Sequence, residues 1–132
     1  MKYKTSELDG ALLDAAVALA DGGRFDPARP SSEMQMILAG GRLVLAGPQP
    51  QQLAHHQWSP SADWAQGGPI IDRERIATEF HQSDGIWTGA VRSRRVSWED
   101  WENDGWGEGP TPLIAAMRAY VASKFGEEVE LP

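Results

Sequence analysis

The chain contains no cysteine, which excludes disulfide bonds and thiolate chemistry and fits a reducing compartment. It also lacks any apolar run near the roughly 20 residues that span a bilayer, so no membrane role is expected. The first ten residues, MKYKTSELDG, turn polar at once and carry no hydrophobic segment of a signal peptide. These absences together lead us to expect a cytoplasmic protein.

Positive charge is scarce as well. The 132 residues include 12 Lys and Arg against 19 Asp and Glu, giving a formal net charge of -7. The one basic cluster, at Arg92, Arg94 and Arg95, is followed directly by an acidic run. Because nucleic-acid binding depends on clustered basic side chains, a nucleic-acid partner is not expected. The length suits one domain over residues 1–132.

Two helices are predicted near the ends of the chain. The first starts with Asp9 as N-cap and stops at Gly22, with Asp14 and Asp21 pointing away from its apolar stripe. The second runs from the N-cap Thr111 to Gly126 and has Pro112 in first position. Its core stripe comprises Leu113, Ile114, Met117, Tyr120, Val121 and Phe125. Ala115, Ala119 and Ala122 line another side, where a second element could pack closely.

Two hairpins and two short terminal strands are also predicted. A two-residue turn at Gly40-Gly41 would pair Met36 with Leu45. A turn at Asp84-Gly85 would set Phe80 across from Gly89, with Ile76, Thr78 and Phe80 on one common face. The edge strand Tyr3–Ser6 and the tail EEVELP would add short strands. We therefore expect an α+β fold, with an antiparallel sheet of about four or five strands packed with two main helices, and an αβα sandwich as one arrangement.

The span WSPSADWAQGGPIIDRE, residues 58–74, has two interpretations. In both, Ser59 caps a short helix over residues 59–65 and Gly67-Gly68 reverses the chain. In the structural interpretation, Trp58 and Trp64 anchor a crossover while Asp63 satisfies backbone donors. In the functional interpretation, polar side chains line a pocket floored by tryptophan, and these are Ser59, Ser61 and Asp63. The structural interpretation is favoured because aromatic residues serve first as core and anchor groups.

The insert SWEDWENDGWGEGPT, residues 97–111, is the most unusual stretch in composition. Trp98, Trp101 and Trp106 among carboxylates are typical of a protein-contact patch, because tryptophan is enriched in interface hot spots. The alternative is that the tryptophans tuck under a loop and the acids face water. Glycines at 105, 107 and 109 before a helix are similar to a phosphate-binding loop, but no Lys stands at the required place.

Arg118 lies at the border of the apolar stripe of the last helix. It could meet an anionic ligand, although an arginine in this position more often pairs with a carboxylate such as Glu74 or Asp63.

Three segments, taken in order, resemble the NinX-like family of short phage and prophage proteins. They are KTSELDGALLDAAVA, WSPSADWAQGGPIIDRERI and GPTPLIAAMRAYVASKFGEEVEL. The resemblance implies an accessory gene product of a phage or prophage that acts in the bacterial host cytoplasm, and a kinship with small αβα phage domains. It carries no activity with it.

The function expected from these features is non-enzymatic binding of a host or phage protein. A small-molecule, nucleotide-like ligand held by residues 58–74 is the alternative. A hydrolase built from Ser61, Asp63 and His55 or His56 is less favoured, because no G-x-S-x-G elbow surrounds either serine. No cofactor or metal is expected, and self-association stays open.

Overall fold

The computed structural model describes residues 1–47, 57–92, 94–95, 97 and 101–132. Within these ranges the helices are α1 (Gly10–Ala20), α2 (Trp64–Glu74) and α3 (Pro112–Phe125), with short 3-10 helices η1 (Thr5–Glu7) and η2 (Ser31–Glu33). None of the described helices is both long and apolar enough to cross a bilayer. The strands are β1 (Lys2–Lys4), β2 (Arg24–Phe25), β3 (Gln35–Ile37), β4 (Leu43–Ala46), β5 (Gln57–Trp58), β6 (Ile76–His81), β7 (Ile86–Val91), β8 (Arg94–Arg95), β9 (Trp101–Glu102), β10 (Gly105–Gly109) and β11 (Glu128–Glu130). The α+β class is confirmed.

The described strands form four small sheets, in place of the single sheet predicted. One has the antiparallel order β10-β7-β6, and another has the order β2-β3-β4-β5 with β4 and β5 parallel. The remaining pairs are β1-β11 and β8-β9. The two hairpins belong to different sheets because β3 and β4 pack with α1, whereas β6, β7 and β10 pack with α3.

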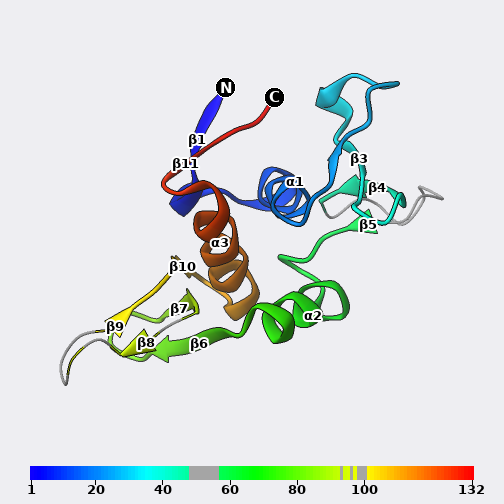
Figure 1. Cartoon of the computed structure of the whole chain (residues 1–132). Helices are drawn as coiled ribbons and strands as arrows, with labels where there is room; N and C mark the ends of the chain where they lie inside the picture. Colours follow the sequence, from blue (N-terminus) through cyan, green and yellow to red (C-terminus); the bar gives the residue numbers. More distant parts are fainter. Residues whose placement is uncertain (48–56, 93, 96, 98–100) are drawn as a thin grey trace.

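Helix α3 lies at the centre of the molecule, between α1, α2 and the β10-β7-β6 sheet (Figure 1). Its predicted start is confirmed, since the Thr111 hydroxyl accepts a hydrogen bond from the Ile114 amide at 3.1 Å. Its predicted end is confirmed at Gly126, which has a φ of 80°. The predicted stripe supplies the core except at Phe125, which is 39% exposed because it lies at the open end of the helix.

The first hairpin has a different register from the predicted one. Met36 pairs with Val44, not with Leu45, and both Met36 and Val44 are buried. The shift arises because the connection is a three-residue loop, closed by a hydrogen bond from the Leu38 amide to the Arg42 carbonyl. A glycine in the left-handed region suits such a loop, and Gly41 has a φ of 88°.

The second hairpin is shifted by two residues. Phe80 pairs with Trp87 instead of Gly89, and the two rings lie 5.2 Å apart between centroids. A longer turn causes this shift, since the amides of Asp84 and Gly85 both donate to the His81 carbonyl. Because the shift is even, Ile76, Thr78 and Phe80 keep the common face that the sequence predicts.

Helix α1 occupies the predicted span, but its acidic residues behave differently from the prediction. The Asp9 side chain makes no capping hydrogen bond. Asp14 is fully buried, although it was expected to point away from the apolar side. Asp21 lies at the helix end, where its Oδ1 accepts hydrogen bonds from Arg73 at 2.6 Å and from the Tyr120 hydroxyl at 3.1 Å.

Helix α2 replaces the predicted short helix and chain reversal. Its N-cap is Asp63 and not Ser59, and it continues through Gly67 and Gly68 to Glu74. A Cβ at position 67 would collide with the Pro60 carbonyl oxygen and lie 2.7 Å from Leu113 Cδ2. Gly67 is therefore required for close packing and does not break the helix.

The two ends of the chain lie side by side (Figure 1). Both predicted terminal strands are present and pair with each other, with Tyr3 opposite Val129. The Met1 amino group donates to the Glu130 carboxylate at 2.6 Å. The first strand ends at Lys4, because Thr5–Glu7 forms η1.

Candidate functional site

Strand β10 places glycines at alternate positions directly beneath α3. The buried residues of the strand are Gly105, Gly107 and Gly109. A Cβ on Gly107 would lie 2.6 Å from both the Ala115 carbonyl oxygen and the Ala119 amide nitrogen. The alanine side of α3 is thus the close-packing face that the sequence predicts. The glycines form its counterpart on the sheet, and they lie in a strand and not in a loop.

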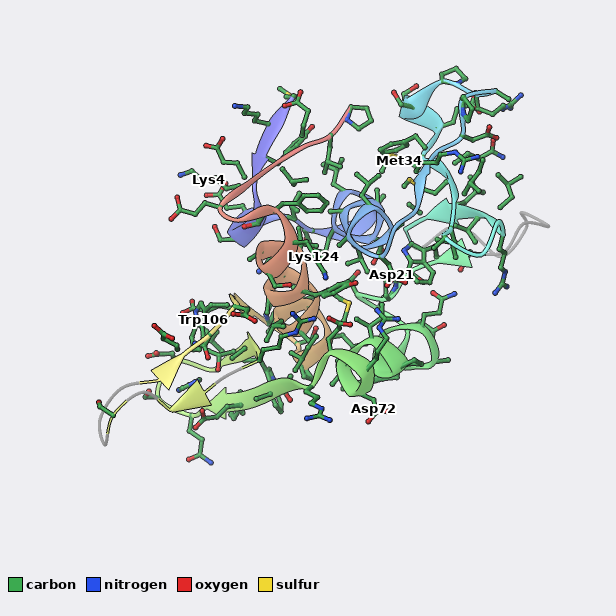
Figure 2. The ribbon with its side chains drawn as sticks, viewed as in Figure 1. Lys4, Asp21, Met34, Asp72, Trp106 and Lys124 are labelled. Atoms are coloured by element: carbon green, nitrogen blue, oxygen red, sulfur yellow. The ribbon has the colours of Figure 1, made fainter. Side chains whose placement is uncertain are left out.

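The residues between these glycines point away from α3. Trp106 and Glu108 are exposed, as the period of two in a strand requires, and the Trp106 side chain keeps 49% of its surface accessible. Figure 2 shows Trp106 on the part of the molecule that lies away from α1 and the β2-β3-β4-β5 sheet.

Arg118 joins β10 to the N-terminal segment. Its Nε donates to the Leu8 carbonyl at 2.8 Å, and its Nη1 donates to the Glu108 carbonyl at 2.7 Å. In the described part of the chain, no carboxylate lies within ion-pair distance of this guanidinium. The predicted partner Glu74 instead pairs with Arg73 and Arg92, so the carboxylate pairing of Arg118 is wrong.

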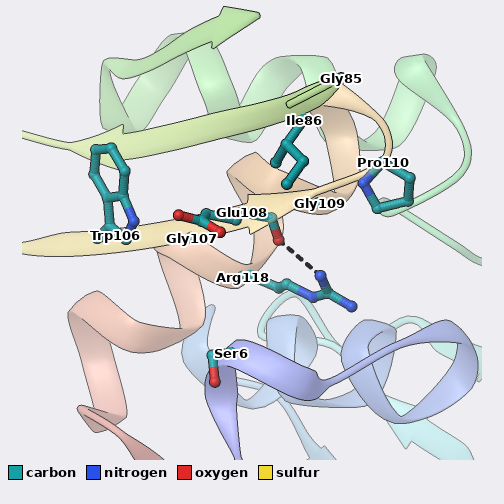
Figure 3. Close-up of a pocket in the computed structure, with 9 residues that line it drawn as sticks. All are labelled: Ser6, Gly85, Ile86, Trp106, Gly107, Glu108, Gly109, Pro110 and Arg118. Carbon is teal, nitrogen blue, oxygen red and sulfur yellow. Dashed lines mark hydrogen bonds between the residues drawn. The ribbon is translucent and has the colours of Figure 1, made fainter. Parts of the chain in front are cut away.

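A hollow of about 600 Å³ opens between β10 and η1 (Figure 3). Trp106, Glu108 and Arg118 line it from the side of the sheet and α3, and Ser6 lines it from the opposite wall. A second hollow of about 590 Å³ continues beside Asp104 and the end of α3. Both are lined by Ser6 and Trp106, so we treat them as one feature, the β10 groove.

A smaller hollow of about 180 Å³ lies on the outer face of the same sheet. His81 and Thr88 line it, and His81 Nε2 is 3.0 Å from Thr88 Oγ1. Trp106 and Glu108 form its other side. Trp106 therefore borders three depressions.

The segment that follows β5 is fastened to α1 through Asp14. The Trp58 indole donates to the Asp14 carbonyl at 2.9 Å, and the Ser61 amide donates to Asp14 Oδ1 at 2.9 Å. Ser59 and Ser61 are buried. These contacts match the anchoring role that the structural interpretation gives to Trp58.

Asp14 is an unusual group to find in this position. Burial raises its pKa from the ordinary value of 3.8 to about 6, against the opposing effect of the hydrogen bonds from Ser61. Among the residues that the structure describes, none provides a hydrogen-bond partner for its Oδ2 atom. Burying a carboxylate that is only partly hydrogen-bonded is costly, so Asp14 takes up a proton more readily in the folded state than in the unfolded state.

The comparisons with known proteins identify the family. A family model described as Bacteriophage P22, NinX, matches residues 4–124. The chain belongs to the NinX family. The match includes β10, Arg118 and most of the β10 groove, as well as the Asp14 anchor. No curated protein matches the chain.

In this NinX-family protein, the polar residues proposed for catalysis are engaged separately. Asp63 Oδ1 accepts from the Ala65 amide at 2.9 Å and caps α2, while the Ser61 amide faces Asp14. His55 and His56 lie outside the described residues. Trp64 is 56% exposed and, with Ser61, lines a hollow of about 320 Å³ at the start of α3.

The remaining predicted binding residues are divided between two places. Trp106 and Arg118 come together at the β10 groove, far in the sequence from the Trp58–Trp64 segment. Trp101 begins β9, and Trp98 lies outside the described residues. Sequence reasoning missed Ser6 and the backbone edge of β10. The alternation Gly-Trp-Gly-Glu-Gly was the available signal, since it has the period of a strand.

Proposed function

We propose that this NinX-family protein works in the bacterial host cytoplasm as a non-enzymatic binding protein for a host or phage protein. The observation that carries the proposal is the setting of Trp106. Its ring is half exposed and borders three depressions at the edge of a sheet whose other face is fixed to α3. Tryptophan in such a setting supplies a large, rigid contact area, which is the property of interface hot spots.

The insert over residues 97–111 belongs to the same proposed surface. Trp98 and Trp101 precede Trp106 closely in the sequence, and β9 leads directly into the β10 groove at Asn103 and Asp104. The proposed contact patch is therefore centred on Trp106, and Trp98 and Trp101 are close to it in the sequence.

The chain offers a matched control for testing this surface. Trp106→Ala and Trp64→Ala each remove one large exposed ring, of 49% and 56% accessibility, from different places. We expect an immobilised Trp106→Ala variant to lose a specific partner from host lysate, identified by mass spectrometry. The Trp64→Ala variant should retain it. Far-UV circular dichroism and thermal melts check that both variants are folded.

The converse pattern contradicts the proposal. If Trp64→Ala loses the partner while Trp106→Ala keeps it, the segment at the start of α2 is the binding surface. Equal capture by wild type and both variants would exclude either tryptophan as an anchor.

A small-molecule function is the second candidate, and the hollow of about 320 Å³ beside Trp64 favours it. This volume lies at the low end of ligand pockets, and an exposed indole next to it can stack on a base. A thermal-shift screen of nucleotides and related metabolites tests this function. Binding here predicts a stabilisation that Trp64→Ala removes and Trp106→Ala retains.

A further inference from the structure

Strand β10 presents an open backbone edge to the β10 groove. In the described part of the chain its one sheet neighbour is β7. The Glu108 carbonyl accepts from Arg118, so this carbonyl faces away from β7. Because backbone groups alternate in direction along an antiparallel strand, Trp106 also turns its N–H and C=O to the open edge.

Two common protections of an edge strand are missing from β10. Natural proteins often blunt such edges with lysine or proline, whereas the sequence of β10 is Gly-Trp-Gly-Glu-Gly, with Glu108 as its one charged residue. Arg118 occupies the carbonyl of Glu108, and this contact closes one end of the edge. The backbone of Trp106 lies in the middle, where the two hollows of the groove meet.

The groove has space for one additional strand. Its two hollows, of about 600 and 590 Å³, follow the edge from Asn103 to Pro110. Ser6 on η1 forms the facing wall, and Ala122 on α3 lies in the floor of the second hollow. An extended segment placed there would hydrogen-bond to Trp106 and set alternate side chains beside its indole ring.

The charges around the groove specify the chemistry of the occupant. The ionisable residues that line it are Lys4, Asp104, Glu108, Arg118, Glu127 and Glu128. Carboxylates therefore outnumber cations, and Arg118 already donates to two main-chain carbonyls. A second copy of this chain would bring the same acidic edge and a net charge of -7 against the first. A basic segment complements the groove, because opposite charges favour encounter and like charges oppose it.

We propose that the protein partner binds through an extended, basic peptide segment, which adds to the open edge of β10 as the fourth strand of the β10-β7-β6 sheet. The proposal rests on the proposed function and names the chemical class of the partner's segment. Main-chain hydrogen bonds to Trp106 supply the pairing, and the acids near Asp104 supply the preference for lysine and arginine.

Synthetic peptides test the proposal without knowledge of the natural partner. The probe is acetyl-KTKVKTK-amide, which is basic, β-branched at alternate positions and free of terminal charges. One matched control is acetyl-ETEVETE-amide. The other is the basic peptide with N-methyl groups at alternate residues, made in two versions that carry them at the odd-numbered or at the even-numbered positions. Titrations of ¹⁵N-labelled protein at low salt should show amide shifts concentrated at Trp106 and Glu108. The acidic peptide, and one of the two methylated versions, should bind at least tenfold more weakly than the unmodified basic peptide.

Two protein variants separate the backbone from the ring. Trp106→Ala removes the indole but keeps the N–H, whereas Trp106→Pro removes both, and proline is tolerated on an edge strand whose N–H faces outward. Peptide affinity should fall at least a further tenfold from the alanine to the proline variant. The β7 amide resonances report whether the sheet is intact in each variant.

Several results would overturn the proposal. These are no binding of the basic peptide at millimolar concentration, equal affinity for both N-methylated versions, or shifts confined to residues away from β10. A dimer in light scattering that Trp106→Pro dissociates would instead assign the edge to a second copy. Partner capture that depends on Trp106 while the basic peptide fails would leave the binding function standing and reject the strand addition. Capture that is indifferent to Trp106 would reject the binding function itself.

Discussion

Replacing Gly107 by alanine tests the contact that shapes the groove. The added Cβ would lie 2.6 Å from the Ala115 carbonyl oxygen and from the Ala119 amide nitrogen, at least 0.8 Å short of ordinary van der Waals contact. Both atoms belong to the helix backbone, so neither can rotate away. Relief requires α3 to move off the sheet, and α3 carries much of the core.

The expected cost follows from two opposing effects. Overpacking of a well-packed interior costs about 1–3 kcal/mol. Removing a glycine from the unfolded chain returns about 0.4–1 kcal/mol. Because rigid backbone opposes the new methyl group at Gly107, the overpacking cost should lie near its upper end. We expect a net loss of about 2 kcal/mol.

Urea unfolding followed by tryptophan fluorescence and circular dichroism measures this loss. The control is Gly40→Ala, because an added Cβ at Gly40 meets nothing within 4 Å and the residue does not have a positive φ. This control should match or slightly exceed the wild type in stability. A Gly107→Ala variant within about 0.5 kcal/mol of the wild type, the usual range for surface changes, would refute the close-packing argument.

The remaining predictions concern α1, α2 and α3. Gly67→Ala should lower the free energy of unfolding by about 1–3 kcal/mol, because its Cβ meets the Pro60 carbonyl oxygen; a urea melt within about 0.5 kcal/mol of the wild type would contradict this. Asp14 has a folded pKa of about 6, above its ordinary 3.8, so between these values the folded state holds a proton that the unfolded state has lost. Its contribution to stability is present below pH 4 and should fall by about 2–3 kcal/mol as the pH rises to 7. In Asp14→Asn the free energy of unfolding should no longer fall across this pH range. Parallel pH profiles for the variant and the wild type would refute this role of Asp14. Thr111→Ala should destabilise the protein by about 1 kcal/mol through loss of the α3 cap, with Thr111→Ser close to wild type in chemical denaturation.

Local chemistry in the sequence predicted α3 well. Each of its end signals acts within one helical turn: Thr111 caps the helix, Pro112 has a fixed φ, and Gly126 adopts a positive φ. No distant residue therefore needs to be known. The same kind of rule failed at Gly67, where the relevant neighbours are Pro60 and Leu113. A glycine that breaks a helix and a glycine that lets another helix approach look alike in a sequence.

The two hairpins show how errors of register differ in consequence. At Asp84-Gly85 the shift was two residues, so Phe80 changed partner but kept its face. At Gly40-Gly41 the shift was one residue, and Met36 moved from opposite Leu45 to opposite Val44. Because side chains alternate with a period of two, only the odd shift changes which cross-strand residues lie on one face. Loop length decides between these cases, and the turn residues alone did not reveal it.

The candidate site was predictable only in part, for a related reason. Trp106 and Arg118 attract notice by residue type, but the facing wall at Ser6 is brought to them by α3 and by the pairing of the chain ends. The segment Gly-Trp-Gly-Glu-Gly nevertheless carries a signal that its interpretation as a loop leaves unused, because glycine alternates with larger residues at the period of a strand. Read as a strand, its glycine face must meet something that excludes side chains, and the alanine side of α3 was already identified as a surface of that kind.

The exposure of the groove then follows from the packing. Glycines can approach α3 only if all of them lie on one face of β10, and a period of two then forces Trp106 and Glu108 to the other face. The close fit beneath the strand also fixes the strand in place, so its open edge is held rigid beside η1. Glycine weakens a strand in isolation, since it has high conformational entropy and no side chain to pack. The contact with α3 therefore both stabilises β10 and holds the Trp106 backbone in position for a partner.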